Sequence, residues 1–377
     1  LPTPELLAKY QSILRDDLGI GKILLFKFGE KWEILLNSGV PELLSDAIEV
    51  ERDLLCYTGI TTEVPKDPFK GVDIIVPVQN NNVPLPFVLI GDIDEEGEGM
   101  SPVIKHLNFI QTISSIIVVA IENLRLFKES LKQEALRREL ELAARMQQML
   151  IPDNRRLPAN ERINACGFYN PHYEVGGDYY DFVNLSDDVV GFCMADVSGK
   201  GMSAALLMSN FQASLRALFT PEADLETLVR KLNEIIISNS SGERFITVLI
   251  ARYNLITREL EYVNAAHNPP VVIDIHTRTI SMLKTSCVGI GMLDEIPVIN
   301  TIKITLPEST KIVLYTDGLS ELKDSEGNDL GASPIVKHFP NTRPVADNIP
   351  AMIDDLNIRA GNPGLFDDVS ILAVEIR

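Results

Sequence analysis

The sequence has few cysteines, and they are scattered. The four in 377 residues are Cys56, Cys166, Cys193 and Cys287, and no two of them have the C-x-x-C spacing of a zinc or redox site. None begins the Cys-x5-Arg loop of thiol-dependent phosphatases. The sequence therefore predicts reduced, buried thiols in a cytoplasmic protein and no thiol nucleophile.

Basic residues and long apolar runs are scarce as well. The chain has 34 Lys and Arg against 53 Asp and Glu, for a formal net charge of −19. Nucleic-acid affinity depends on cationic side chains that neutralise phosphates, and anionic membranes repel such a surface. The longest apolar stretch, 113–120, is too short to cross a bilayer. We therefore expect neither nucleic acid nor membrane as a partner.

Acidic residues, in contrast, occur at the ends of several apolar, strand-like runs. An unpaired buried carboxylate costs several kcal/mol, so such residues need a cation, hydrogen bonds or an exposed position. One Asp-Gly at a strand end usually marks a turn. Several that converge would form an all-oxygen pocket suited to Mg²⁺ or Mn²⁺, and no His or Cys cluster competes with them. The residues are Asp178, Asp196, Asp317 and the pair Asp367–Asp368.

Taken in order, these segments resemble the metal-dependent protein phosphatase (protein phosphatase 2C) family. The resemblance is to its bacterial branch, typified by the stage II sporulation protein E and the stress sigma-factor regulatory phosphatases. It covers roughly residues 150–377. The motifs that carry it are GGDYYDF at 176–182, DVSGKG at 196–201, YVNAAHNPP at 262–270, YTDGLSE at 315–321 and DDVS at 367–370.

The resemblance implies a site that holds two Mn²⁺ or Mg²⁺ ions. Asp196 would bridge them, with the carbonyl of Val197 on the second ion. Asp317 and Asp367 would complete the shell of the first ion, and Asp178 would hold the second. Adjacent Asp residues can exchange roles, so Asp368 stays open as an alternative to Asp367.

Three neighbouring residues have less certain roles. Asp181 is expected to be structural, and so is His267, which belongs to a turn; the family's usual glycine before this histidine is Ala266 here. Lys200 is expected either to contact substrate phosphate or to be solvated. Gly199-Lys200-Gly201 is not a P-loop, because Met194 stands where that loop needs a glycine.

The N-terminal part has a helix over 4–17, strand-like runs and a long exit helix from about 102. This order resembles a GAF sensor domain, and Trp32 and Cys56 could either line a pocket or pack in its core. The predicted organisation is mixed α/β: a GAF-like sensor (1–112), a coiled-coil helical linker (113–151) and an α-β-β-α phosphatase sandwich (152–377). Strands in two sets with helices outside favour that sandwich.

The linker contains two apolar seams. Residues 113, 117, 120, 124, 127 and 131 have the 4-3-4-3-4 spacing of a coiled coil, and 136, 140, 143, 147 and 150 form a second seam. The five-residue step between the seams shifts the phase of the stripe near 133–135. This pattern predicts a parallel homodimer through residues 113–131. The second seam either packs on the phosphatase core or forms a junction that the sensor can rotate.

The resulting hypothesis is an Mn²⁺- or Mg²⁺-dependent phosphoserine/phosphothreonine protein phosphatase controlled by its sensor. The family resemblance implies a phosphorylated anti-sigma-factor antagonist as substrate, in a partner-switching pathway. The alternative is a pseudophosphatase that binds a partner or ligand as a signalling scaffold without catalysis. A Ca²⁺-binding structural protein, suggested by the acidic run 324–329, lacks the closing Glu of an EF-hand.

Overall fold

The computed structural model describes residues 3–28, 31–80, 83–93, 102–172, 175–240, 242–359 and 365–377. The chain divides into two compact units, Leu1–Leu136 and Arg137–Arg377. Each unit is considered by itself, and helix α5 (Leu107–Gln148) contributes residues to both.

The N-terminal unit is built on one antiparallel sheet. Its strands are β1 (Ile20–Phe28), β2 (Trp32–Ser38), β3 (Ile74–Asn80) and β4 (Val83–Ile93), in the order β2-β1-β4-β3. Helix α1 (Thr3–Ser12) and a π-helical turn (Ile13–Asp17) precede it. The short helices α2 (Glu42–Ser45) and α3 (Val50–Asp53) lie between β2 and β3, and α4 (Pro102–Lys105) lies between β4 and α5. The predicted helix and strand runs are confirmed.

Both faces of this sheet are covered, which explains why β1 is an almost continuous apolar run. Ile23 and Leu25 point to one face, where they pack with Tyr10 of α1 and Ile110 of α5. Their neighbours on β1 point to the other face, into a cluster that includes Phe69 of the β2–β3 connection. The sheet is therefore the middle layer of a three-layer unit.

Helix α5 gives part of its apolar surface to this core, and this corrects the predicted first seam. Ile117 is buried in the cluster and Ile113 packs against it, so these two positions are not available for a dimer seam. Phe127 and Leu131, further along the same predicted seam, are 62% and 54% exposed. The prediction was wrong at its first two positions because a core-facing stripe and a dimer stripe have the same helical period.

By length and composition, α5 could also cross a membrane. One 18-residue window within it has a mean hydropathy of 1.5, and 28% of that window is buried in the structure. The helix thus meets a length and hydropathy criterion for a membrane span, whereas the apolar stretch 113–120 taken alone was expected to be too short to cross a bilayer. A core helix passes the same test, and Ile110, Ile117 and Ile121 of α5 lie in a core.

The C-terminal unit contains two five-stranded antiparallel sheets. One has the order β11-β10-β13-β14-β5, and the other β12-β9-β8-β7-β6. The strands of the first are β5 (Ile163–Asn170), β10 (Val271–Asp274), β11 (Ile280–Met282), β13 (Thr310–Tyr315) and β14 (Val369–Ile376). Those of the second are β6 (Tyr179–Asn184), β7 (Val189–Val197), β8 (Ile246–Asn254), β9 (Glu259–Ala265) and β12 (Ile302–Thr305).

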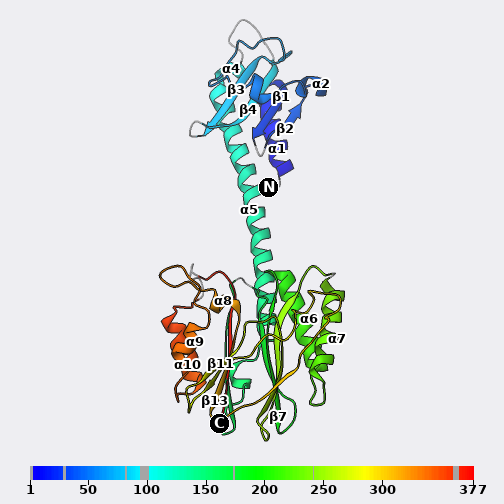
Figure 1. The fold of residues 1–377 in the computed structure, drawn as a ribbon. Helices are drawn as coiled ribbons and strands as arrows, with labels where there is room; N and C mark the ends of the chain where they lie inside the picture. The colour runs from blue at the N-terminus through cyan, green and yellow to red at the C-terminus, as the bar shows by residue number, and fades with distance from the viewer. Residues whose placement is uncertain are drawn as a thin grey trace. The chain divides into compact units, whose positions relative to one another are not determined.

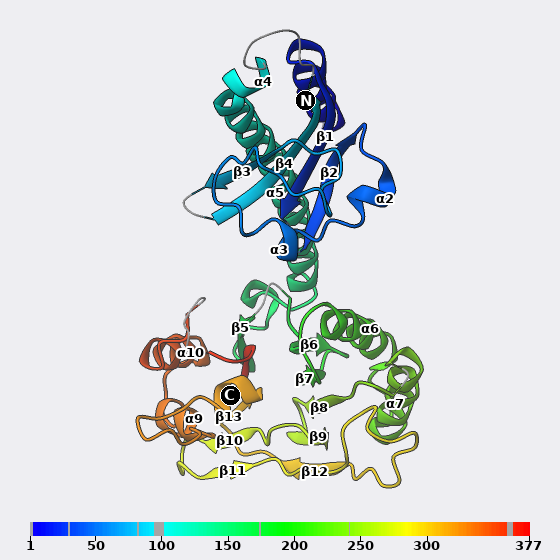
Figure 2. The same ribbon diagram turned by 90° about the horizontal axis from the view of Figure 1, so that it is seen from above.

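The two sheets pack face to face between two layers of helices. Helices α6 (Met202–Leu218) and α7 (Leu225–Ser240) cover the second sheet, whereas α9 (Ser333–His338) and α10 (Val345–Asp355) cover the first (Figures 1 and 2). One buried cluster contains Phe211 of α6, Leu249 of β8 and Leu314 of β13, so it fills the space between the sheets as well as that beneath α6. The predicted α-β-β-α sandwich is confirmed.

Local departures from the prediction have physical reasons. Helix α9 was not predicted, because its six residues are too few to show a period. Helix α10 begins at Val345, directly after Pro344, and proline is common at helix starts. Ala266 has φ +55°, a left-handed conformation that favours the glycine usual at this position.

Candidate metal centre

The register of one sheet brings two of the predicted carboxylates together. Strand β6 pairs with β7 so that Tyr179 faces Ala195, which places Asp178, just before β6, opposite Asp196 near the end of β7. The carboxyl groups of Asp178 and Asp196 lie close enough for each to affect the pKa of the other. The carbonyl of Val197 lies beside them: its oxygen is 2.9 Å from where a Cβ on Gly177 would stand.

Hydroxyl groups from the other sheet complete the surroundings of Asp178. Thr316 and Ser370 lie opposite each other at the ends of β13 and β14. The Thr316 Oγ1 and Ser370 Oγ hydroxyls donate to Asp178 Oδ2 at 2.7 and 2.6 Å. The Asp178 carboxylate, buried at 2% exposure, therefore ties the two sheets together where their ends meet.

Two further carboxylates reach the same place from the ends of β13 and β14. Asp317 is the first residue of the short helix α8 (Asp317–Ser320), and Asp367 precedes β14. The chain segments pack so closely that a Cβ on Gly318 would come within 1.9 Å of the carbonyl oxygen of Asp368. A glycine after Asp317 is therefore required, which gives the Asp-Gly motif a steric reason.

Burial and mutual repulsion dominate the electrostatics of the group. The pKa of Asp196 is raised to about 8 by burial and by the charges of Asp317, Asp367 and Asp368. Burial, together with the charges of Asp196 and Asp368, raises the pKa of Asp178 well above its usual range. Burial and the charge of Asp367 also raise that of Asp317. These carboxylates, distant in sequence, thus interact as one cluster.

Asp367 and Asp368 have different surroundings. Asp368 is buried, and its two carboxylate oxygens accept hydrogen bonds from the backbone N–H groups of His172, at 2.7 Å, and Gly177, at 2.9 Å. The side chain of Asp367 is 37% exposed and forms an ion pair with Lys200 Nζ at 2.7 Å. Asp368 therefore fixes the loop before Asp178, whereas Asp367 faces a cation.

The donor type and charge of these residues fit divalent cations. In the structure, however, the side chains are arranged around hydrogen-bond donors of the protein and not around an ion. Within the described parts of the chain, no three His, Cys, Asp or Glu side chains converge tightly enough to hold one ion. The carboxylates contact protein donors or each other instead. The pKa values of Asp178, Asp196 and Asp317 are raised by burial and by neighbouring negative charges, which a cation would offset. Hard oxygen ligands of this kind suit Mg²⁺ or Mn²⁺.

His267 and Asp181 lie in structural settings. His267 is 3% exposed, and burial lowers its pKa to about 4, so its ring is neutral near pH 7. Its backbone N–H donates to Asn264 Oδ1 at 2.8 Å. Asp181 accepts two hydrogen bonds from Arg216 and a third from Tyr179 Oη. Neither residue belongs to the acidic cluster.

Sequence reasoning missed the groups that hold the turn after Asp196. Arg244 donates to the carbonyl of Ser198 at 2.8 Å and to Ser203 Oγ at 3.1 Å. Gly199, with φ +86°, allows the guanidinium to approach, since a Cβ there would overlap it. Arg244 lies outside the sequence motifs. The one signal for it in the sequence is a basic residue just before the strand β8.

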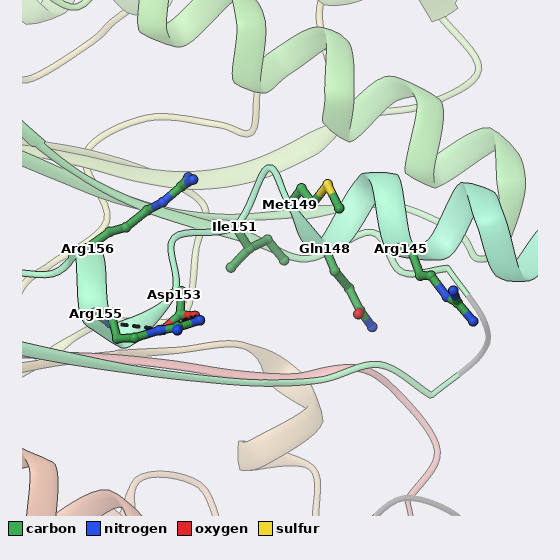
Figure 3. Close-up of a pocket in the computed structure, with 7 residues that line it drawn as sticks. All are labelled: Arg145, Gln148, Met149, Ile151, Asp153, Arg155 and Arg156. Carbon is green, nitrogen blue, oxygen red and sulfur yellow. Dashed lines mark hydrogen bonds and ion pairs between the residues drawn. The ribbon is translucent and has the colours of Figure 1, made fainter.

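A cavity of about 610 Å³ lies elsewhere, beside the end of α5 (Figure 3). Asp153 supplies the only carboxylate among its lining residues, and Arg155 pairs with it at 2.6 Å. In Figure 3 the side chains of Arg145 and Arg156 lie at opposite ends of the view and do not converge. This cavity has neither the acidic donors nor the convergent cations of a metal or phosphate site.

The sandwich with acidic residues at its sheet ends is the fold of the protein phosphatase 2C class. Its structural relatives include the SiaA-PP2C domain of Pseudomonas aeruginosa, with a TM-score of 0.54 over 65% of this chain and 99% of that domain. The two are 18% identical, so the likeness concerns the fold alone. Residues 186–377 match the family of Stage II sporulation protein E (SpoIIE). The chain belongs to this family.

Two curated relatives come from Bacillus subtilis. Phosphoserine phosphatase RsbU is 28% identical over 197 residues, 52% of this chain, and phosphoserine phosphatase RsbP is 23% identical over 245 residues, 64% of this chain. The matches span 57% and 58% of the length of those proteins. Asp196, Asp317 and Asp367 lie within the segment that matches the family, and Asp178 lies just before it.

The raised pKa of Asp196 predicts how stability depends on pH. Folded Asp196 keeps its proton up to about pH 8, whereas the ordinary value is 3.8. The contribution of Asp196 to the stability of the folded protein is therefore complete below its ordinary pKa of 3.8, and it is lost as the pH rises through its folded pKa of about 8. For the metal-free protein, urea titrations should show less stability at about pH 8 than at about pH 6.

The Asp196→Asn variant provides the control, because an amide does not titrate and the decline should be smaller. Mn²⁺ should stabilise the wild-type protein more at about pH 8 than at about pH 6, because metal ligands must be deprotonated. Equal pH dependence in the wild type and in Asp196→Asn would contradict this electrostatic description.

Proposed function

We propose that this protein is a metal-dependent phosphatase that hydrolyses phosphoserine or phosphothreonine in a protein substrate. The main observation that supports this proposal is the cluster of buried carboxylates at the facing ends of two sheets, where burial and mutual repulsion raise the pKa values of Asp178, Asp196 and Asp317. Divalent cations would relieve that repulsion, and they are the usual partners of phosphate in enzymes. Family membership supports the same reaction class.

In this proposal Asp178, Asp196, Asp317, Asp367 and the carbonyl of Val197 hold two Mn²⁺ or Mg²⁺ ions. When bound, such ions lower the pKa of a water molecule and neutralise charge on a phosphoryl group. Thr316 and Ser370 keep Asp178 in place through their hydroxyl hydrogen bonds. Asp367 is favoured over Asp368 as a ligand, because both oxygens of Asp368 already accept backbone hydrogen bonds.

Lys200 is the cation best placed to meet the substrate. Its ammonium lies 2.7 Å from Asp367 Oδ2, and the side chain is 43% exposed. Once a metal ion compensates the negative charge of Asp367, Lys200 can exchange this ion pair for a contact with a phosphate oxygen. This gives the glycine-rich turn after Asp196 a role in orienting substrate.

RsbU and RsbP are named phosphoserine phosphatases, which supports phosphoserine as the substrate group here. We propose that the substrate is a phosphorylated anti-sigma-factor antagonist in a cytoplasmic partner-switching pathway. The acidic chain, with a net charge of −19, suits a protein substrate better than nucleic acid.

We further propose that residues 1–112 form a GAF-like sensor for an unidentified small ligand or protein, 113–151 a linker and 152–377 the phosphatase domain. The linker would also join two copies of the chain through residues 113–131. Exposed apolar side chains on α5 support this contact, with Ile116, Val119 and Leu126 at coiled-coil spacing beside Phe127 and Leu131. Ile113 and Ile117 contribute to the sensor core instead.

Asp196→Asn tests the catalytic proposal. Replacing the bridging ligand should lower Mn²⁺-dependent turnover of a phosphoserine protein by at least about a hundredfold, since even residues that only support metal ligands are worth roughly 10- to 100-fold. Asp187→Asn, which alters an exposed aspartate, is the matched control and should keep full activity. A scaffold without catalysis would show no Mn²⁺-dependent phosphate release in the wild type and unchanged signalling in Asp196→Asn.

Phe127→Glu tests the dimer. A charge in an apolar seam is unfavourable, so this variant should shift the mass measured by light scattering from dimer toward monomer. Lys128→Glu, at the next and equally solvent-facing position, should leave the dimer intact. A monomeric wild-type protein, or a dimer indifferent to Phe127→Glu, would refute the proposed contact.

A further inference from the structure

The last turn of α5 is joined to the acidic cluster through the side chain of Gln147. This residue is 6% exposed. Its Nε2 donates to the carbonyl of Gly176 at 2.6 Å, and its Oε1 accepts from the N–H of Gly176 at 3.1 Å. The side-chain amide thus satisfies both polar groups of one buried residue, as a neighbouring strand would.

Gly176 leads directly to the residues of the proposed metal centre. A Cβ on Gly176 would lie 2.2 Å from Asp368 Oδ2 and 2.4 Å from Tyr169 Oη, so this backbone fits tightly against both side chains. The next residue, Gly177, donates its N–H to Asp368 Oδ2 at 2.9 Å. Asp178 follows. A displacement of Gly176 would therefore be passed to two carboxylates of the cluster.

A second contact lies one turn earlier on the same face of α5. Ala144 packs in a small buried cluster with Val175, the residue before Gly176, and with Ala205 of helix α6. Helix α6 begins directly after the glycine-rich turn that follows Asp196. Ala144 and Gln147 together therefore contact the segments on both sides of the acidic cluster, the one before Asp178 and the one after Asp196.

We propose that Gln147 is a positioning residue that makes metal affinity depend on how the last turn of α5 is seated. When the side-chain amide is bonded to Gly176, the Gly176–Asp178 backbone is held where Asp178 and Asp196 face each other. A rotation of α5 by one residue, about 100°, would remove Gln147 from Gly176 and loosen that backbone. The proposal rests on the metal-dependent function above and adds the contact through which the linker regulates it.

The test compares Gln147→Leu with Gln148→Leu in the full-length chain. Leucine is similar in size to glutamine but forms no hydrogen bond. Gln148 is the exposed neighbour at the end of the same helix, so its replacement controls for a change in helix composition. Gln147→Glu is the second variant: it keeps an acceptor for the Gly176 N–H, but it loses the donor to the Gly176 carbonyl and adds a negative charge there.

The primary measurement is the Mn²⁺ dissociation constant by calorimetry. Gln147→Leu should bind Mn²⁺ about 10- to 100-fold more weakly than the wild type, the usual effect of losing a group that supports metal ligands. Gln148→Leu should stay within about twofold, and Gln147→Glu should fall between the two. In the metal-free protein, amide exchange at Gly176 and Gly177 should accelerate in Gln147→Leu alone.

Activity adds a separate comparison. Gln147→Leu should require more Mn²⁺ for half-maximal turnover and regain most of the wild-type kcat at saturating Mn²⁺. A folded Gln147→Leu with wild-type Mn²⁺ affinity and wild-type exchange at Gly176 would overturn the inference; should that variant not fold, unchanged affinity in Gln147→Glu would do so. A wild-type protein that binds Mn²⁺ without releasing phosphate would instead overturn the proposed catalytic function and leave this coupling in place.

Discussion

Repulsion between buried carboxylates is the constraint on which the C-terminal unit depends. Asp178 and Asp196 face each other across two paired strands, and the charges of Asp317, Asp367 and Asp368 act on the same place. Grouping so many acids at low exposure is unfavourable unless protons, hydrogen bonds or cations compensate it. The structure shows hydrogen bonds to Asp178 and Asp368, the raised pKa values of Asp178 and Asp196 favour retained protons, and the proposed function would supply cations.

The sandwich makes this arrangement possible because the carboxylates come from two different sheets. The hydroxyls of Thr316 and Ser370 link β13 and β14 to Asp178, so the site also connects the layers. If the cluster binds divalent cations as we propose, stability and metal binding are coupled, because a cation that binds only the folded protein stabilises it. That coupling would also offer a means of control, since a small change in the supporting groups would change the affinity for the ions.

Much of this could be predicted from the sequence, and the exceptions have physical causes. Asp178, Asp196, Asp317 and Asp367 stand at the ends of apolar runs, and Asp178 and Asp317 also have a glycine neighbour. This local pattern is visible without a structure. The support of Asp178 by Thr316 and Ser370 joins residues 138 and 192 positions apart, and no local pattern encodes such contacts. Gln147 was noticed only as a position of an apolar seam, because periodicity does not show what a buried polar side chain will bind.

In the first linker seam, the sequence pattern was recognised but was assigned to the wrong contact. Ile113 and Ile117 have the right spacing for a coiled coil, yet they lie at the core of the N-terminal unit. Hydrophobic periodicity shows that a helix buries a face but does not identify the surface that covers it.

The central claim is that the clustered carboxylates jointly hold a pair of divalent cations. Anomalous diffraction from crystals grown with Mn²⁺ tests it most directly. The account predicts two peaks about 3.5–4 Å apart, with Asp196 bound to both and Asp178, Asp317 and Asp367 around them. The absence of any peak among these side chains, in crystals where the protein is folded and Mn²⁺ is in excess, would contradict it.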